Sequence, residues 1–258
     1  MHELPLVFFT VLGQTSVGLL LLSYLSQRLK LISVQQLAYA NLAALILMGL
    51  GFLVGMFHLG QLLRSVNMIF GAGRSPMSNE ILINGLFVGL LVVTLFFSFI
   101  KKNSTLANGF NLLTLVAGVL FVFAITRVYQ IETIATWNTQ HTSLQMWLTM
   151  FVAGGAVAMA MGSRKIGAIV CLVAICVSVV SKPFYLEFLY ETLSQLASEQ
   201  TIFWAIQLFC LGLGVMAATL ALVRQEKIIR FLVSAALLII VGELAGRIAF
   251  YNLWAIPM

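Results

Sequence analysis

The sequence has very little charge, and its eight acidic residues are all glutamate, with no aspartate among 258 residues. Charged residues make up 9% of the chain, against roughly a quarter of an ordinary soluble domain. A composition so poor in charge excludes a soluble globular protein. The formal charge of +6 reflects where Lys and Arg flank apolar runs, so it gives no reason to expect a nucleic-acid partner.

Cysteine and histidine are also scarce, with three of each. Three cysteines without a CxxC pair cannot supply the four thiolates of an iron–sulfur cluster. A haem held by two histidines needs two inward-facing ligands at matched depth. Only His58 stands near a helix body, whereas His2 precedes the first apolar run and His141 falls in a loop. We therefore expect no haem, no iron–sulfur cluster and no metal site in this chain.

Apolar residues, in contrast, make up 61% of the sequence. They form long runs of about 20 residues, each long enough to cross the ~30 Å hydrocarbon core of a membrane as a helix. Eight such runs are predicted, at about 4–25, 37–58, 80–100, 106–129, 144–162, 166–186, 201–223 and 231–253.

The fold class that follows is an all-α membrane protein with eight transmembrane helices in one bundle. The connections between the runs are too short to bury a soluble core. Residues 1–258 are therefore expected to form a single polytopic membrane domain in contact with membrane lipid.

Lys and Arg predict the orientation of this bundle, because they are enriched in the inner loops of membrane proteins. With the N-terminus outside, the inner side receives nine of the fourteen: Arg28, Lys30, Lys101, Lys102, Arg164, Lys165, Arg224, Lys227 and Arg230. Both termini are thus expected on the outer side of the membrane.

Polar residues gather between the second and third predicted spans, at 56–81. His58 ends the second span, and Ser78 is a plausible cap that would place Glu80 in the first turn of the third span. The apolar spacing over 59–70 predicts a short amphipathic helix in the outer interface, with Arg64 on its polar side. His58 and Glu80 are therefore expected at similar depth.

A histidine beside a carboxylate can accept and release protons near neutral pH. A hydroquinone head group between His58 and Glu80 could give up its two phenolic protons to them as its two electrons leave. Two simpler interpretations stay open: Glu80 gains about 0.3–1 kcal/mol from the helix dipole alone, and His58 is an interfacial residue.

Two further polar pairs stand near the outer ends of spans. Glu243 and Arg247 are four residues apart, with the acid first, and predict a helical ion pair that ties helices together or joins a ligand site. Arg127 and Tyr129, at the end of the fourth span, either complete the cavity or anchor the helix.

With these residues in view, the sequence resembles the DmsC family, the membrane anchor subunit of dimethyl sulfoxide reductase, over nearly its whole length. The order and spacing of the shared segments carry the resemblance. They are "HELPLVFFTVLGQ" at 2–14, "MGLGFLVGMFHLG" at 48–60, Arg64, Asn67, "SNEI" at 78–81, "RVY" at 127–129, Trp137, "LTMFVAGG" at 148–155, "GELAGR" at 242–247 and "FY" at 250–251.

The resemblance implies a haem-free subunit of the bacterial cytoplasmic membrane that oxidises menaquinol near the outer (periplasmic) face. Electrons would pass to an iron–sulfur subunit and then to a molybdopterin catalytic subunit, which performs the terminal reduction in anaerobic respiration. The quinol-site histidine and glutamate of the family match His58 and Glu80, with Arg64, Arg127 and Tyr129 as further cavity residues.

Two other classes of function remain possible on the sequence. A polytopic transporter also carries polar residues within its spans, although it usually places them near the bilayer midplane at broken helices. A purely structural tether for a membrane-bound complex would need no chemistry at His58 or Glu80.

Overall fold

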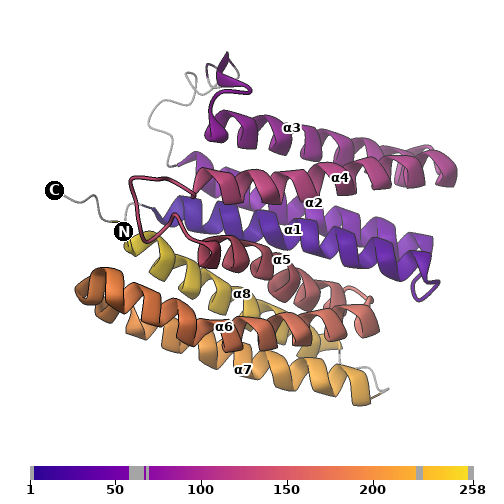
Figure 1. Cartoon of the computed structure of the whole chain (residues 1–258). Helices are drawn as coiled ribbons and strands as arrows, with labels where there is room; N and C mark the ends of the chain where they lie inside the picture. The colour runs from indigo at the N-terminus through magenta and orange to yellow at the C-terminus, as the bar shows by residue number, and fades with distance from the viewer. Residues whose placement is uncertain (1–2, 58–66, 68–69, 225–228, 255–258) are drawn as a thin grey trace.

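A computed structural model of the chain describes residues 3–57, 67, 70–224 and 229–254. The described residues form eight long helices and no strand (Figure 1), which confirms the predicted fold class. The helices are α1 (Leu4–Arg28), α2 (Val34–Met56), α3 (Pro76–Leu95), α4 (Ser104–Val128), α5 (Gln140–Ala160), α6 (Arg164–Glu199), α7 (Thr201–Val223) and α8 (Ile229–Asn252).

All eight helices are long and apolar enough to cross a membrane. Each predicted span corresponds to one of them, but α6 was predicted to end at 186 and continues to Glu199. Its 36 residues are not one straight helix, because Pro183 lies inside it and the backbone of Leu193 (φ −150°, ψ 72°) is not helical and kinks it there. The predicted span ends at residue 186 because apolar residues become less frequent there. A helix does not end at that point, because its backbone hydrogen bonds do not depend on apolar side chains.

The start of α3 also differs from the prediction. Its N-cap is Ser75 and its first residue is Pro76, so Ser78 lies inside the helix and does not cap it. Proline suits the first helical position because its fixed φ is already helical and its missing N–H needs no partner there. Glu80 is consequently the fifth residue of α3, one turn deeper than expected.

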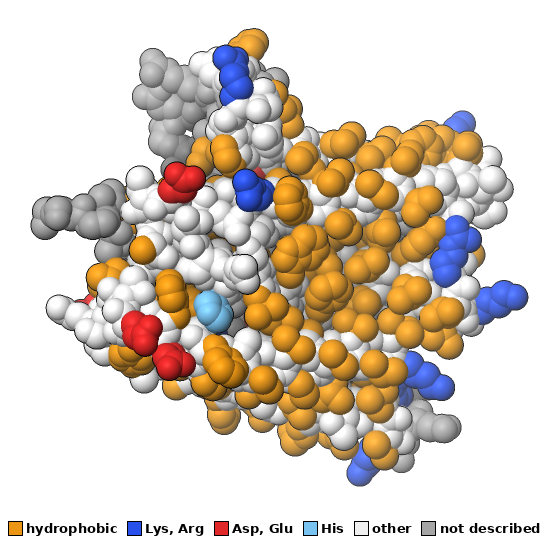
Figure 2. Space-filling view, in the orientation of Figure 1, with side chains coloured by type: hydrophobic (Ala, Val, Ile, Leu, Met, Phe, Trp, Pro, Cys, Tyr) orange, Lys and Arg blue, Asp and Glu red, His pale blue; other side chains and the backbone are white. Residues whose placement is uncertain are grey.

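The two ends of the bundle differ in charge. We call the end where α1 begins and α8 ends the terminal end, and the opposite end the basic end (Figure 1). Glutamates gather at the terminal end and most Lys and Arg at the basic end (Figure 2). This separation matches the pattern from which we predict that the terminal end faces outward.

The most buried span is α1, which packs against α2, α4, α5 and α8. Its closest approach is to α5, where Gly18 faces Gly154. A Cβ added to Gly154 would lie 2.6 Å from the Gly18 Cα, closer than carbon atoms can approach. Small residues thus allow the two backbones to come into contact. Such close packing holds helices together inside a membrane, where the hydrophobic effect does not drive them to associate.

We expect Gly154→Leu to separate α1 from α5 and to lower the stability of the bundle by about 1–3 kcal/mol or more, as overpacking does. The measurement is thermal unfolding of the purified protein in detergent. Gly85→Leu is the matched control, because a Cβ on this α3 glycine meets nothing within 4 Å. Equal unfolding temperatures for the two variants would contradict the prediction.

Candidate functional site

Of the residues predicted to form the quinol site, His58 and Arg64 lie outside the described residues. Glu80 is described, and it is buried on α3 with 6% of its surface exposed. Its Oε1 atom makes no hydrogen bond within the described part of the chain. A buried carboxylate oxygen without a partner is uncommon in native proteins, because no hydrogen bond replaces the water that it loses and its desolvation therefore costs stability.

Tyr129 and Arg127 are both predicted as cavity residues, but one is buried and the other is exposed. Tyr129 follows α4 and is buried, and its hydroxyl lies 2.5 Å from the hydroxyl of Tyr251 on α8. Arg127 is exposed and donates to the side chain of Gln130 at 3.1 Å. The structure therefore brings Tyr129 into the interior against Tyr251 and leaves Arg127 at the surface.

The Tyr129 phenol is within electrostatic range of Glu80 and stays protonated. Burial raises the pKa of Tyr129 well above its usual range, and the neighbouring Tyr251 hydroxyl and Glu80 carboxylate act in the same direction. Glu80 also interacts electrostatically with Tyr251. The direct contact in this region is the bond between the Tyr129 and Tyr251 hydroxyls, and Glu80 acts on both tyrosines through its charge.

An aromatic cluster holds the two tyrosines in place. Trp137 and Phe250 pack around Tyr129 with ring centroids 5.7 Å and 5.8 Å from its own. The Trp137 indole N–H also donates to the Phe250 carbonyl at 2.9 Å, and Thr136 donates to the Leu253 carbonyl at 2.7 Å. These bonds fasten the loop after α4 to the end of α8.

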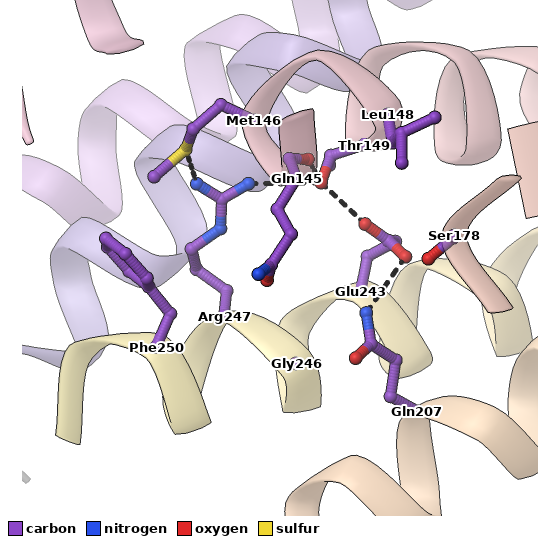
Figure 3. A pocket seen from close by; sticks show the side chains of 10 residues that line it. All are labelled: Gln145, Met146, Leu148, Thr149, Ser178, Gln207, Glu243, Gly246, Arg247 and Phe250. Atoms are coloured by element: carbon purple, nitrogen blue, oxygen red, sulfur yellow. Dashed lines mark hydrogen bonds between the residues drawn. The ribbon is translucent and has the colours of Figure 1, made fainter. Parts of the chain in front are cut away.

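Glu243 and Arg247 belong to a second buried polar cluster (Figure 3). Within the described structure they make no direct ion pair, which corrects the contact predicted from their four-residue spacing. Thr149 on α5 stands between them, accepting from Arg247 at 3.0 Å and donating to Glu243 Oε2 at 2.6 Å. Arg247 also donates to Gln14 on α1 at 2.8 Å and to the sulfur of Met146.

On its other side Glu243 reaches two further helices. Gln207 on α7 donates to Glu243 Oε1 at 3.3 Å and accepts from the ammonium of Lys182 on α6 at 2.8 Å. The cluster therefore carries two positive charges and one negative charge and joins α1, α5, α6, α7 and α8. Gly246 leaves room for the Gln207 side chain in this cluster, because any Cβ at position 246 would collide with that side chain.

This polar cluster, formed by Gln14, Thr149, Lys182, Gln207, Glu243 and Arg247, is too tightly packed to be a ligand site. The cavity that it borders, lined also by Gln145, Ser178 and Phe250, has a volume of about 10 Å³. That is at most the space of one water molecule. Its side chains satisfy each other across five helices, so its geometry indicates a tie that holds the bundle together.

Comparison with known proteins finds relatives that match nearly the whole chain. A model of the family described as "DMSO reductase anchor subunit (DmsC)" matches residues 1–253. The sequence is 32% identical to the YnfH chain of anaerobic dimethyl sulfoxide reductase from Escherichia coli (strain K12), over 98% of this protein and 95% of the relative. It is 30% identical to the C subunits of anaerobic dimethyl sulfoxide reductase from the same strain and from Haemophilus influenzae, with the same coverage.

The chain belongs to the DmsC family of DMSO reductase anchor subunits. The predicted resemblance is thereby confirmed over the whole chain. As a DmsC-family protein with eight apolar helices, it is a multi-pass protein of the bacterial inner membrane. An anchor subunit also implies partner subunits that it holds at the membrane.

Several polar residues of this DmsC-family protein were not predicted as site or network residues. Gln14, Thr149, Gln207 and Lys182 lie within apolar runs, where nothing in the sequence indicates a partner on another helix. The signal that could have found them is the rarity of polar residues within the spans. An ionisable residue inside a membrane costs free energy and is usually paired with another residue. Lys182 was the strongest such signal.

For the DmsC-family bundle we expect Glu243→Gln to be strongly destabilising, by about 3–5 kcal/mol, because it leaves the charges of Arg247 and Lys182 buried without a counter-charge. Chemical unfolding of the purified protein in detergent measures this. Glu132→Gln is the control, because Glu132 is exposed. The role of the cluster as a tie would be refuted by a Glu243→Gln protein as stable as the control.

Proposed function

We propose that this protein oxidises menaquinol at its terminal end and passes the electrons to an iron–sulfur subunit of a DMSO-reductase-type molybdoenzyme. The observation that carries the proposal is the carboxyl group of Glu80, which is buried near the start of α3 and whose Oε1 atom has no partner among the described residues. A polar group of this kind near the membrane surface is a functional-site signal, because its burial costs stability and such costly groups are enriched at functional sites.

Oxidation of a hydroquinone to a quinone releases two electrons and two protons, so the site must supply two proton acceptors. The Glu80 carboxylate is one. We propose His58 as the other. It stands two positions after Met56, the last residue of α2, and α2 ends at the same end of the bundle at which α3 begins. An imidazole and a carboxylate suit this work because both exchange protons near neutral pH.

The two electrons need an acceptor outside this polypeptide. The relatives are named as chains of anaerobic dimethyl sulfoxide reductase, a name that describes a multi-subunit reductase. We propose that an iron–sulfur subunit docks at the terminal end, close to Glu80, and that a molybdopterin subunit carries out the terminal reduction. The terminal end then faces the periplasm, as the charge distribution predicts.

The alternative of a transporter is less well supported by the geometry. Transporters bind substrate near the bilayer midplane, at helices interrupted there. Here the non-helical residue inside α6 is Leu193, beyond the apolar part of the helix, and the π-helical turn Phe96–Ile100 is at the basic end of α3. Pro183 also lies inside α6, but the cavity lined by the neighbouring Lys182 has a volume of only about 10 Å³, which leaves no room for a transported substrate.

We expect Glu80→Gln and His58→Ala to leave the complex assembled while quinol-driven reduction falls at least about 100-fold, as loss of a general base does. Reduction driven by a soluble dye that donates directly to the catalytic subunit should be unaffected in both variants. Glu132→Gln, at the same end but exposed, is the control. Normal quinol turnover in both variants would favour a structural tether.

We also propose that no haem takes part. The histidine that the structure describes, His141, packs its ring against Tyr185 and Phe188 with centroids 5.7 Å and 6.0 Å away. A reduced-minus-oxidised spectrum of the purified complex should show no b-type haem in stoichiometric amount. A stoichiometric haem band would overturn this part of the proposal.

A further inference from the structure

Two small polar cavities are neighbours in the interior of the bundle. The inner cavity is the one that the polar cluster borders (Figure 3). The outer cavity has the same volume of about 10 Å³ and lies nearer the terminal end, where α5 begins and α6 ends. It is lined by Leu144 and by the polar residues His141, Gln145, Ser178, Ser181, Lys182 and Tyr185. Gln145 and Ser178 line both cavities, so the two spaces share a wall.

The wall of the outer cavity carries polar atoms that lack a partner. The Gln145 amide nitrogen and the Tyr185 hydroxyl are buried and make no hydrogen bond within the described structure, although the two side chains are close enough to interact. Lys182 is 4% exposed, and its ammonium, which has three N–H donors, has one described acceptor, the Gln207 side chain at 2.8 Å. The outer cavity is therefore surrounded by donors that need an acceptor.

The inner cavity adds an acceptor to this arrangement. Its wall includes the carboxylate of Glu243, and the Gln145 side chain points into the space between Glu243 and Arg247 (Figure 3). A cavity of about 10 Å³ is close to the least space that holds one water molecule, and a buried water needs roughly two to four polar partners. Each of the two cavities offers that space and those partners.

Toward the basic end, the polar interior gives way to an apolar layer. The helices around the polar cluster contribute residues that are at most 1% exposed, and these form the layer: Val152, Ala156 and Met159 on α5, Cys171 and Ile175 on α6, Leu211 on α7 and Ile239 on α8. The packing is tight, since a Cβ added to Gly167 would lie 2.6 Å from the backbone nitrogen of Met159. The apolar layer thus separates the polar cluster from the basic end.

We propose that one water molecule binds in each of the two cavities, and that these waters hydrate the polar cluster from the terminal end only. In the outer cavity the water accepts from Lys182 and Gln145 and donates to the Tyr185 hydroxyl. In the inner cavity the water accepts from the second N–H of the Gln145 amide and donates to Glu243. Charged side chains within a membrane are tolerated where partners or water stabilise them, so these waters lower the cost of the cluster.

The two waters also connect the buried charges to one aqueous phase. The titratable side chains around them are His141 on α5, Lys182 and Tyr185 on α6, and Glu243 and Arg247 on α8. Through the waters, Lys182 and Glu243 exchange protons with the solution at the terminal end. The apolar layer has no group that could continue this exchange, so the bundle stays closed to protons. The inference concerns the polar cluster and does not depend on quinol oxidation.

Two methionines of α5 provide a matched test, because each is only 1% exposed. Met146 lines the inner cavity, whereas Met159 lies in the apolar layer. A short X-ray pulse splits water into hydroxyl radicals where the water is bound, and a methionine beside it becomes the sulfoxide, which mass spectrometry measures. In the purified protein Met146 should be oxidised at least about tenfold faster than Met159, because apolar cavities are dry.

The half-exposed Met77 gives the radical dose in the same sample. Two results would overturn the proposal. Equally slow oxidation of Met146 and Met159 would mean that the cavities hold no water. Equally fast oxidation of both would mean that water passes the apolar layer.

A second experiment closes the path. Ser178→Val replaces the hydroxyl that both cavities share with apolar volume and should reduce Met146 oxidation to the rate of Met159. Ser194→Val makes the same change at an exposed position of α6 and should leave that rate unchanged. Gln145→Leu, which removes the shared amide at nearly the same size, should act as Ser178→Val does. Met146 oxidation at the original rate in a folded Ser178→Val or Gln145→Leu protein would refute the proposal, and the unchanged protein decides the question if neither variant folds.

Discussion

Hydrocarbon offers no hydrogen-bond partners, and this constraint governs where every polar side chain of the bundle is found. Backbone groups meet it by forming helices from end to end. Side chains meet it by finding partners on other helices, as Arg247 does with Gln14 and Thr149, and Lys182 with Gln207. Because these bonds cross between helices, they fix the relative positions of α1, α5, α6, α7 and α8.

Six buried side-chain atoms of the described residues have no hydrogen-bond partner, and among them Glu80 contributes the one that belongs to a carboxyl group. Its buried Oε1 has no partner within the described residues, although the polar cluster of Arg247, Glu243 and Lys182 shows that the fold can satisfy buried charges elsewhere. This unsatisfied carboxyl oxygen and the linked hydroxyls of Tyr129 and Tyr251 are buried polar groups of the kind on which the proposed function depends.

Much of the fold could be predicted, because a span is a local property of about 20 successive apolar residues. The eight spans and the all-α class follow from that property alone. The ends of helices were harder. The extension of α6 to Glu199 and the start of α3 at Pro76 depend on hydrogen bonding and proline geometry outside the apolar runs, to which a hydropathy pattern is insensitive.

The candidate site divides in the same way. The sequence by itself determined the membrane location, the spans, the charge difference between the ends and the presence of rare charged residues such as Glu80, Glu243 and Arg247 within the spans, because each is a matter of composition along the chain. Only the tertiary structure decided which of them meet. It placed Thr149 between Glu243 and Arg247, joined Tyr129 to Tyr251 and left Arg127 at the surface. The physical reason is that a side chain contacts the residues toward which its helix is rotated. The rotation and crossing angle of each helix are set by packing at positions such as Gly18 and Gly154.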